Sequence, residues 1–499
     1  MTPARLVPCT DNLFSFFHSA RPASHARIQT LIQLPIKAHA HLCSKRMVAK
    51  TMTQNISEQI AAFAAQTQWA DIPNNVVHEA KRSLLNYFAT AIAGSTEIGM
   101  EKSLAVLTPF SGQGACKIIG RAERVDMALA AYLNGVSANI YDFDDTHQAT
   151  VIHLTAPIAP AVFAMAETQP CDGKALLKAF IIGGEIECRI GNAASPSHYA
   201  RGWHITATCG VFGAAAAVAG MLDLSEEQHV WALGNAAAHT SGLVENLGTM
   251  SKSISVGNAA RNGILSALLA REGFSGPADP LAGVRGFLNV YSDLPSLDRM
   301  TDGLGEVWEI AKNTYKPYPG GIVMHPMIEG CLRLYHEAGL RAEDVVEVEL
   351  TGHPLLRERT DRPDVTTGRL SQISAQHTIA IALRRGKAGL TEFTDETVAE
   401  TLRDGIRPKI TFIDDASRNI ANVHMRVRTR QGPGHEIEIL AAKGGPDNPM
   451  TDGELEEKLA ELAAFRGFSR DVKAISGAVW TLDQADDASA IMGLANVHA

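Results

Sequence analysis

Apolar residues recur at helical spacing through most of the chain after residue 54. Ile56, Ile60 and Phe63 fall on one helical face, and Asn55 followed by Glu58 forms the capping-box pattern that begins a helix. The same spacing continues between proline and glycine breaks. It predicts further helices over residues 77–94, 125–140, 173–189, 206–221 and 258–270, and one that begins after Ser225.

The pattern changes after about residue 310. Residues 346–350 read Val-Glu-Val-Glu-Leu, and this alternation predicts a half-buried strand. Residues 410–413 and 424–429 alternate in the same way, and residues 434–440 would pair with 424–429 as a hairpin. Helices are expected over residues 324–338, 376–385 and 451–465.

These elements predict a mostly α protein with two domains. A chain of 499 residues is too long for one ordinary core. We expect a large all-α helical domain built from both chain ends, residues 52–310 and 444–499, interrupted by a smaller α+β lid domain over residues 311–443.

The first 51 residues differ from the rest in charge. They hold seven lysine and arginine residues but a single acid, Asp11. A basic, acid-poor segment is typical of a targeting peptide, which would make the protein mitochondrial. Alternatively, the segment lies upstream of the true start at Met47 or Met52, and the protein is cytoplasmic. Under either interpretation we expect it to be poorly ordered.

The overall composition excludes several classes of protein. A net charge of −9 argues against a nucleic-acid-binding protein, which would show a basic excess. No run of 18 apolar residues is present, so no membrane span is expected. The seven cysteines are odd in number and contain no CxxC pair. They therefore predict neither a disulfide framework nor a zinc or iron–sulfur site.

The densest polar cluster follows the helix expected over residues 125–140. Residues 141–147 read Tyr-Asp-Phe-Asp-Asp-Thr-His, and His153 follows closely. Polar groups packed this densely must be solvated, be paired with one another, or take part in binding or catalysis. At the helix end Asp142 would orient or tune a base, and His153 would reach a substrate. A solvated capping turn is one alternative, and a metal site is another, with Asp144, Asp145, His147 and His153 as competent ligands.

Three basic positions lie farther along the chain. His204 precedes a glycine- and alanine-rich helix whose N–H groups and dipole would suit a carboxylate. Lys252 could pair with a carboxylate or act as a base if desolvated. Lys316 begins Lys-Pro-Tyr-Pro-Gly-Gly, a rigid and then flexible segment that could position a side chain at a domain junction, with His325 on the same wall. Alternatively, His204 is a surface or packing residue, Lys252 is an ordinary exposed lysine near a helix start, and the segment after Lys316 is a simple linker between domains.

Acid, imidazole and ammonium groups spread in this way predict an acid–base enzyme that acts on a polyanionic small molecule. Their order also resembles that of the MmgE/PrpD family, whose members include 2-methylcitrate dehydratase, cis-aconitate decarboxylase and iminodisuccinate epimerase. The resemblance covers residues 53–490. It rests on Asp-Phe-Asp-Asp-Thr at 142–146, Gly-Trp-His at 202–204, Lys252 with Gly-Asn-Ala-Ala-Arg-Asn-Gly at 257–263, and Lys-Pro-Tyr-Pro at 316–319.

The resemblance implies a homodimer with a site between the helical domain and the lid. It also implies proton chemistry on di- or tricarboxylates without a metal or other cofactor. The family's site residues match Asp142, Thr146, His153, His204, Lys252 and Lys316, and we expect Tyr318 and His325 to contact substrate as well.

One position departs from the decarboxylase members of the family. These carry a histidine shortly after the lysine that matches Lys316, whereas Gly321 stands here. This departure argues against cis-aconitate decarboxylation, and the segment Lys-Pro-Tyr-Pro-Gly-Gly-Ile-Val-Met-His-Pro at 316–326 looks closer to the epimerase-like branch of the family. We expect a cofactor-independent lyase like 2-methylcitrate dehydratase, with an epimerase of the iminodisuccinate type as the alternative. A non-catalytic dimer that binds a carboxylate is a second alternative. In the catalytic schemes, Lys252 and Lys316 hold the carboxylates, His153 or His204 is the base with the other as acid, and Asp142 tunes one imidazole.

Overall fold

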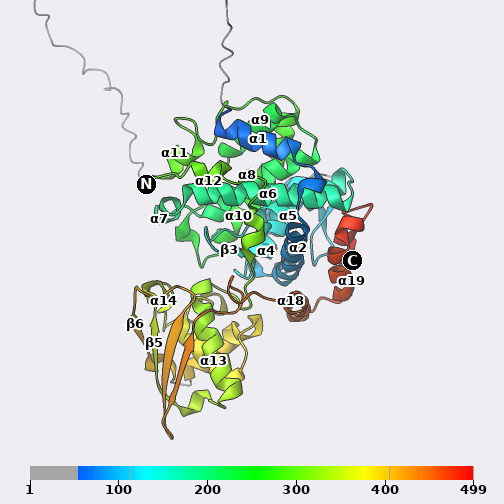
Figure 1. Cartoon of the computed structure of the whole chain (residues 1–499). Coiled ribbons are helices and arrows are strands. Elements are labelled where there is room, and N and C mark those ends of the chain that lie inside the picture. Colours follow the sequence, from blue (N-terminus) through cyan, green and yellow to red (C-terminus); the bar gives the residue numbers. More distant parts are fainter. Residues whose placement is uncertain (1–53, 113, 404, 498–499) are drawn as a thin grey trace, which may run out of the picture. The chain divides into compact units, whose positions relative to one another are not determined.

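The computed structural model describes residues 54–112, 114–403 and 405–497 (Figure 1). The predictions for residues 1–51 fall outside these ranges. The chain is largely helical up to residue 310, with α1 (Ile56–Gln66), α2 (Asn74–Gly94), α3 (Ile98–Leu107), α4 (Met127–Asn139), α5 (Thr155–Thr168), α6 (Gly173–Ala194), α7 (Ser197–Ala200), α8 (Ile205–Met221), α9 (Glu226–Ala237), α10 (Ser251–Arg271), α11 (Phe287–Tyr291) and α12 (Asp298–Thr301).

Strands of the later segment form a four-stranded sheet with helices beside it. The strands are β5 (Val345–Gly352), β6 (Ile410–Asp414), β7 (Val423–Thr429) and β8 (His435–Ile439), and the helices are α13 (His325–Glu337), α14 (Pro354–Thr360), α15 (Gly368–Ser371), α16 (Ala375–Arg385) and α17 (Asp395–Arg403). The strand order is β6-β5-β7-β8, with β5 and β6 parallel and the other pairs antiparallel. The chain then returns to helix in α18 (Asp452–Arg466), α19 (Val472–Trp480) and α20 (Ala490–Leu494).

The prediction of a mostly α protein with a small sheet is confirmed. Asn55 and Glu58 form the expected capping box at the start of α1, and β7 and β8 form the expected hairpin. Within the described ranges no helix combines the length and apolar character needed to cross a membrane.

Glycines allow the central helices to approach closely. A Cβ atom built on Gly183 of α6 would lie 2.6 Å from the carbonyl oxygen of Gly213 in α8. One built on Gly213 would lie 2.8 Å from the carbonyl oxygen of Gly183. Any larger side chain at either position would push the two backbones apart. Alpha-helix α8, which begins directly after His204, is fixed in this way against α6.

The sheet segment has an apolar core of its own. One buried cluster consists only of residues between 323 and 442, among them Val348 and Leu350 on the buried face of β5. Helix α13 packs on the sheet, where Gly330 lies directly against Met425 of β7. The other two clusters consist of residues from the helical segments on either side, apart from Tyr315 and Leu390. The described residues from 54 onward nevertheless form one compact unit, so domain limits at 310 and 443 stay a prediction.

Two helices differ from the sequence-based expectation. Helix α10 begins at Ser251, so the predicted start at Asn258 is wrong. Serine and glycine between residues 251 and 257 have weak helix propensity, but five of these seven residues are buried in the packed interior. Helix α5 was not expected, because Pro157 and Pro160 interrupt it in sequence. Near-complete burial of α5 outweighs both local preferences.

Candidate active site

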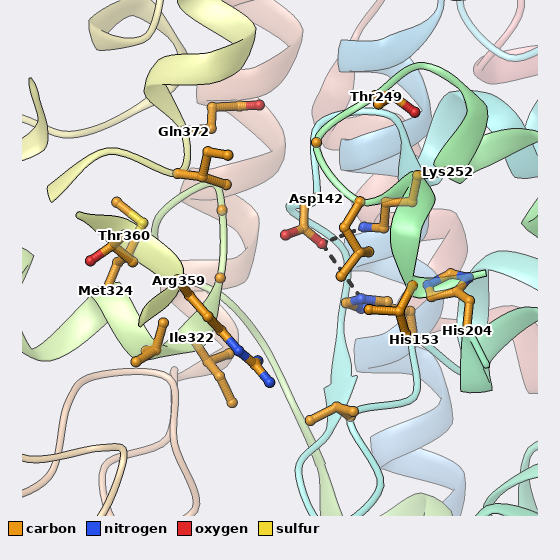
Figure 2. A pocket seen from close by; sticks show the side chains of 18 of the residues that line it. Asp142, His153, His204, Thr249, Lys252, Ile322, Met324, Arg359, Thr360 and Gln372 are labelled. Atoms are coloured by element: carbon orange, nitrogen blue, oxygen red, sulfur yellow. Dashed lines mark hydrogen bonds and ion pairs between the residues drawn. The ribbon is translucent and has the colours of Figure 1, made fainter. Parts of the chain in front are cut away.

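A cavity of about 590 Å³ opens between the helical segments and the sheet segment of this unit. All six residues that match the family's site residues line it: Asp142, Thr146, His153, His204, Lys252 and Lys316. Figure 2 shows Asp142, His153, His204 and Lys252 on one wall, and Ile322, Met324, Arg359, Thr360 and Gln372 on the facing wall.

The loop that carries Asp142 is held in an unusual conformation. Asp142 follows the C-terminal end of α4 and has a φ of 53°, which few non-glycine residues adopt. Its N–H donates to the carbonyl of Asn139 (3.1 Å), and its carbonyl accepts from the N–H of Gly320 (3.2 Å). The strained residue is therefore fixed from both sides, as is common at functional sites.

A short ladder brings Lys316 to the same loop. Strand β3 (Thr146–His147) pairs antiparallel with β4 (Asn313–Thr314), with Thr146 opposite Thr314. Lys316 lies two residues beyond this pair, and its Nζ donates to the carbonyl oxygen of Asp142 at 2.9 Å. Residues more than 160 positions apart in sequence are thus tied together at the cavity wall.

Two ammonium groups share the Asp142 carboxylate. Lys252 Nζ lies 2.5 Å and Lys316 Nζ 3.0 Å from Asp142 Oδ1. Burial opposes ionisation of Asp142, but Lys252 and Lys316 outweigh it and hold its pKa well below the usual range. Burial likewise opposes the charge on Lys252, but Asp142 and Asp144 raise the pKa of that lysine. Two positive charges against one carboxylate leave an excess that favours an anionic ligand.

His153 is buried, and its contacts fix which ring nitrogen holds the proton. Its Nδ1 lies 2.7 Å from the carbonyl oxygen of Asp145, which can only accept. Nδ1 is therefore assigned as the donor, and the neutral ring presents Nε2, 3.5 Å from Asp142 Oδ1, as its basic nitrogen. Burial lowers the pKa of His153; Asp144 opposes this shift, and Lys316 adds to it.

His204 lies at the N-terminal end of α8, as the sequence predicts. Its Nδ1 is 3.4 Å from Ser255 Oγ, and that hydroxyl donates to the carbonyl of Lys252 at 2.8 Å. Because the serine hydrogen is already used, the histidine donates from Nδ1 and again presents Nε2. Burial, with Lys252 and His153 nearby, lowers the pKa of His204 to about 3. Both imidazoles are thus neutral at physiological pH and suited to accept a proton.

Two further carboxyl groups lie behind His153. Asp144 Oδ2 accepts from Asn139 (2.7 Å), and Asp145 Oδ2 accepts from Thr155 and Asn313 (2.6 Å each). Burial, together with Asp144, raises the pKa of Asp145 to about 7. Neither aspartate lines the cavity, so both act by holding the surrounding side chains in place and not by contact with a ligand.

Asp142, Asp144 and His153 also form the one metal-competent group among the residues that the structure describes. Their ligand atoms lie within 4.8 Å of one another. However, the Asp142 oxygen in this group already contacts two ammonium nitrogens. A divalent cation at the same oxygen would have to displace or repel them. The donor set therefore fits an ammonium-based site better than a metal-based one.

Lys458 is a supporting residue that the sequence analysis did not identify. It lies on α18, and its buried Nζ donates to Asn86 Oδ1 and to the carbonyls of Phe143 and Lys316, each at 2.8 Å. Three acceptors match the three N–H bonds of one ammonium group. Lys458 therefore joins the Asp142 loop to the Lys316 segment. A single lysine in an amphipathic helix gives no sequence signal of this role.

Tyr318 and His325 do not line the cavity, although we expected them to contact substrate. Tyr318 packs against the sheet-segment core, and its ring meets that of His325 edge-on at 5.7 Å. Gly321 does lie on the cavity wall. A Cβ atom built on it would meet only Val323, at 3.8 Å, so this position has room for a side chain.

Comparison with known proteins identifies similar chains, two of which match over most of their length. A cis-aconitate decarboxylase-like protein, oryM, of Aspergillus oryzae is 27% identical over 470 residues, covering 88% of this chain and 97% of that protein. A cis-aconitate decarboxylase of Aspergillus terreus is 26% identical over 496 residues, covering 91% and 98%. The human cis-aconitate decarboxylase is 30% identical over 258 residues, covering 49% and 53%.

Two family models match most of the chain. The model of the MmgE/PrpD N-terminal domain matches residues 58–300, and that of the MmgE/PrpD C-terminal domain matches residues 318–484. The cavity residues come from both matched regions, since Lys252 lies in the first and Arg359 in the second. The protein therefore belongs to the MmgE/PrpD family.

Proposed function

We propose that the protein is a cofactor-independent lyase that removes a proton from the carbon next to a carboxylate of a small di- or tricarboxylate. The observation that carries this proposal is the grouping of Lys252 and Lys316 on Asp142 beside two buried imidazoles. Ammonium groups bind the substrate carboxylate, and neutral imidazoles accept protons at physiological pH. The relatives named as cis-aconitate decarboxylases support the carboxylate-acting lyase class.

In this scheme Nε2 of one histidine takes the α proton, and the C–H electron pair moves toward the carboxylate. Lys252 retains two N–H bonds and Lys316 one beyond those that bind Asp142. These donors would stabilise the enolate-like charge as it develops. The scheme leaves open whether His153 or His204 is the base, because both present Nε2.

The second half of the reaction defines the product. If the intermediate expels a β-hydroxyl group, the proton taken by the first imidazole passes through Nε2 of the other imidazole to that group, water leaves and a C=C bond forms, as in 2-methylcitrate dehydration. If the intermediate is reprotonated on the opposite face, the reaction is an epimerisation. We favour dehydration over epimerisation because the similar proteins are named as decarboxylases, and decarboxylases, like dehydratases, are lyases.

Decarboxylation of cis-aconitate is a second candidate, favoured by the names of the relatives. It requires cleavage of a C–C bond to carbon dioxide and protonation of the remaining carbanion. Gly321 on the cavity wall argues against it, because the decarboxylase members of the family that this sequence resembles carry a histidine near this position. Without that imidazole, the sheet-segment wall lacks a proton donor at residue 321.

Proton NMR in deuterated water would distinguish these reactions. The purified protein would be incubated with 2-methylcitrate, citrate, cis-aconitate and iminodisuccinate. A new vinyl signal with release of water supports dehydration, and a terminal methylene signal with release of carbon dioxide supports decarboxylation. Deuterium uptake without loss of material supports epimerisation. If no substrate changes, the protein is a carboxylate-binding dimer or acts on another class of compound.

The variant His204→Gln tests the role of the imidazoles. We expect it to fold and to lose roughly 100- to 10,000-fold in kcat, the usual contribution of general acid–base catalysis. His229→Gln is a matched control, because His229 is also buried but does not line the cavity. A folded His204→Gln enzyme with near-normal kcat would refute the proposed chemistry.

A further inference from the structure

Five cationic side chains line the cavity, and four of them already bind protein acceptors. Lys252 and Lys316 bind Asp142, Arg362 donates to the carbonyls of Asp361 and Glu358, and Arg369 binds Glu97. Arg359 is the exception: it makes no hydrogen bond or ion pair with any residue that the structure describes. Its five N–H donors are therefore the largest set on the cavity wall that is open to a ligand.

Arg359 lies on a helix that is anchored to the sheet segment. Leu356 and Thr360, on either side of it in α14, are buried. Arg357 on the same helix forms a two-pronged ion pair with Asp414 of β6. The backbone that carries Arg359 is thus fixed, although the side chain itself is exposed.

The Arg359 side chain extends from the sheet-segment wall toward the wall that carries His153 and Lys252 (Figure 2). Its guanidinium carbon lies 5.9 Å from the centre of the Tyr199 ring, which also lines the cavity. A cation–π contact at this distance orients a guanidinium without using its N–H bonds. The side chain is therefore directed into the cavity with its donors free.

The cavity thus has two positive poles on opposite walls. One is the Lys252–Lys316 pair, close to the imidazoles, and the other is Arg359. A guanidinium binds a carboxylate through two parallel N–H bonds. A ligand with a single carboxylate could engage only one pole, whereas a di- or tricarboxylate could engage both.

We propose that Arg359 binds a second carboxylate of the substrate, distant from the carbon that reacts, and so selects substrates with two or more carboxylates. This inference rests on the proposed lyase function and extends it to substrate selection. The contact is made in both the ground state and the transition state, because the distant carboxylate does not react. Loss of it should therefore affect KM more than kcat.

The first experiment compares Arg359→Ala and Arg359→Lys with the wild type on the substrate found by NMR. We expect KM to rise about 10- to 100-fold in Arg359→Ala, the range for a lost hydrogen bond to a charged group, with kcat changed less than fivefold. Arg359→Lys should recover part of the loss, and added guanidinium ion should partly restore Arg359→Ala. Arg357→Ala is the matched control on the same helix, and its KM should stay within twofold of wild type. An unchanged KM in Arg359→Ala would overturn the inference.

Calorimetric binding of citrate and of acetate separates this inference from the proposed chemistry. Citrate should bind Arg359→Ala about 10- to 100-fold more weakly than wild type, whereas His204→Gln should bind it nearly normally. Acetate should not distinguish Arg359→Ala from wild type. If the wild type binds citrate but catalyses no reaction, the proposed function fails while the anchoring role stands. Equal citrate affinity in Arg359→Ala and wild type would overturn the anchoring role alone.

Discussion

His153 and His204 are neutral bases because the protein surrounds them with apolar contacts and ammonium groups. Burial lowers the pKa of both rings, and that of His204 falls to about 3. The pH profile of kcat/KM reports the ionisation of the free enzyme. A base with an ordinary pKa of 6.5 would lose about tenfold in kcat/KM between pH 8 and pH 5.5.

If His204 is the base, we therefore predict that kcat/KM, corrected for ionisation of the substrate, falls less than twofold over this range. If His153 is the base, the acid limb should lie below pH 6.5, because the pKa of His153 is lowered. The sign follows from the shift: protonation inactivates a base only as the pH falls through its lowered pKa. Initial rates at low substrate concentration between pH 5.5 and pH 8 would measure this. An acid limb near pH 6.5 that disappears in His204→Gln or a His153→Gln variant would contradict the assignment of neutral bases.

Asp145 should make the folded protein less stable as the pH rises. Burial and Asp144 raise its pKa to about 7, above the value of about 3.9 in an unfolded chain. The folded state therefore retains a proton that the unfolded state has lost, and the free energy of unfolding declines between about pH 4 and pH 7. In Asp145→Asn this decline should be removed, since an amide does not ionise.

Between pH 5 and pH 8 the difference in unfolding free energy between Asp145→Asn and wild type should thus shift in favour of the variant by roughly 2–3 kcal/mol, because about two pKa units of the shift lie in this range at 1.36 kcal/mol each. Urea denaturation at pH 5 and pH 8 would measure it. Asp486→Asn, at an exposed position, is the control and should show no such shift. A difference that does not vary with pH would mean that Asp145 stays ionised throughout.

At the scale of elements, local patterns predicted most helices and the hairpin but not how they meet. Alternation in residues 424–429 was sufficient for β7 because each strand buries one face. The start of α10 was not predicted, because tertiary packing and not local sequence determines it. For the same reason, the sequence did not place Lys252 in the first turn of that helix. The motifs identified Asp142 and Lys316, but the positive φ of Asp142 and the contacts of Lys458 arise only from tertiary structure.

Helices α4 and α10 meet through glycines, and their ends carry the two sides of the Asp142–Lys252 ion pair. A Cβ atom built on Gly257 of α10 would lie 2.5 Å from the carbonyl oxygen of Tyr132 in α4. Such an atom would force the helices apart. Because Lys252 lies about one turn and a half before Gly257, its Nζ would move relative to Asp142.

We predict that Gly257→Ala lowers the free energy of unfolding by about 1–3 kcal/mol, the usual cost of overpacking, and lowers kcat/KM at least tenfold. Chemical denaturation and initial rates would measure the two effects. Gly477→Ala is the matched control, because a Cβ atom at this position in α19 meets nothing within 4 Å. It should leave the rate unchanged and raise stability by up to about 1 kcal/mol. Equal behaviour of the two variants would show that the close contact does not position Lys252.

At the scale of the whole molecule, the site is assembled from segments that lie far apart in sequence. Helix α18 returns to α2, where Lys458 binds Asn86 and also joins the Asp142 loop to Lys316. The second positive pole, Arg359, comes from the sheet segment between them. The catalytic groups lie on the helical segments, and the proposed substrate anchor lies on the sheet segment. Turnover therefore depends on how these two segments are held together.

The surface of α10 predicts self-association. Ile254, Leu265 and Leu269 are each more than a third exposed, and their spacing places them on one face of the helix. A row of exposed apolar side chains on one helix face is typical of an interface between protein chains. A homodimer is also what the family resemblance implied. A second copy of the chain would cover the stripe by presenting the same face, as twofold symmetry requires.

We predict that the protein elutes as a dimer of about 107 kDa, twice the chain mass of 53.4 kDa, in size-exclusion chromatography with light scattering. The double variant Ile254→Glu and Leu265→Glu should elute as a monomer, because two like charges would face their symmetry copies across the contact. Leu402→Glu, at an equally exposed apolar position on α17, should remain dimeric. A dimeric double variant would place the contact elsewhere, and a monomeric wild type would leave the α10 stripe exposed to water.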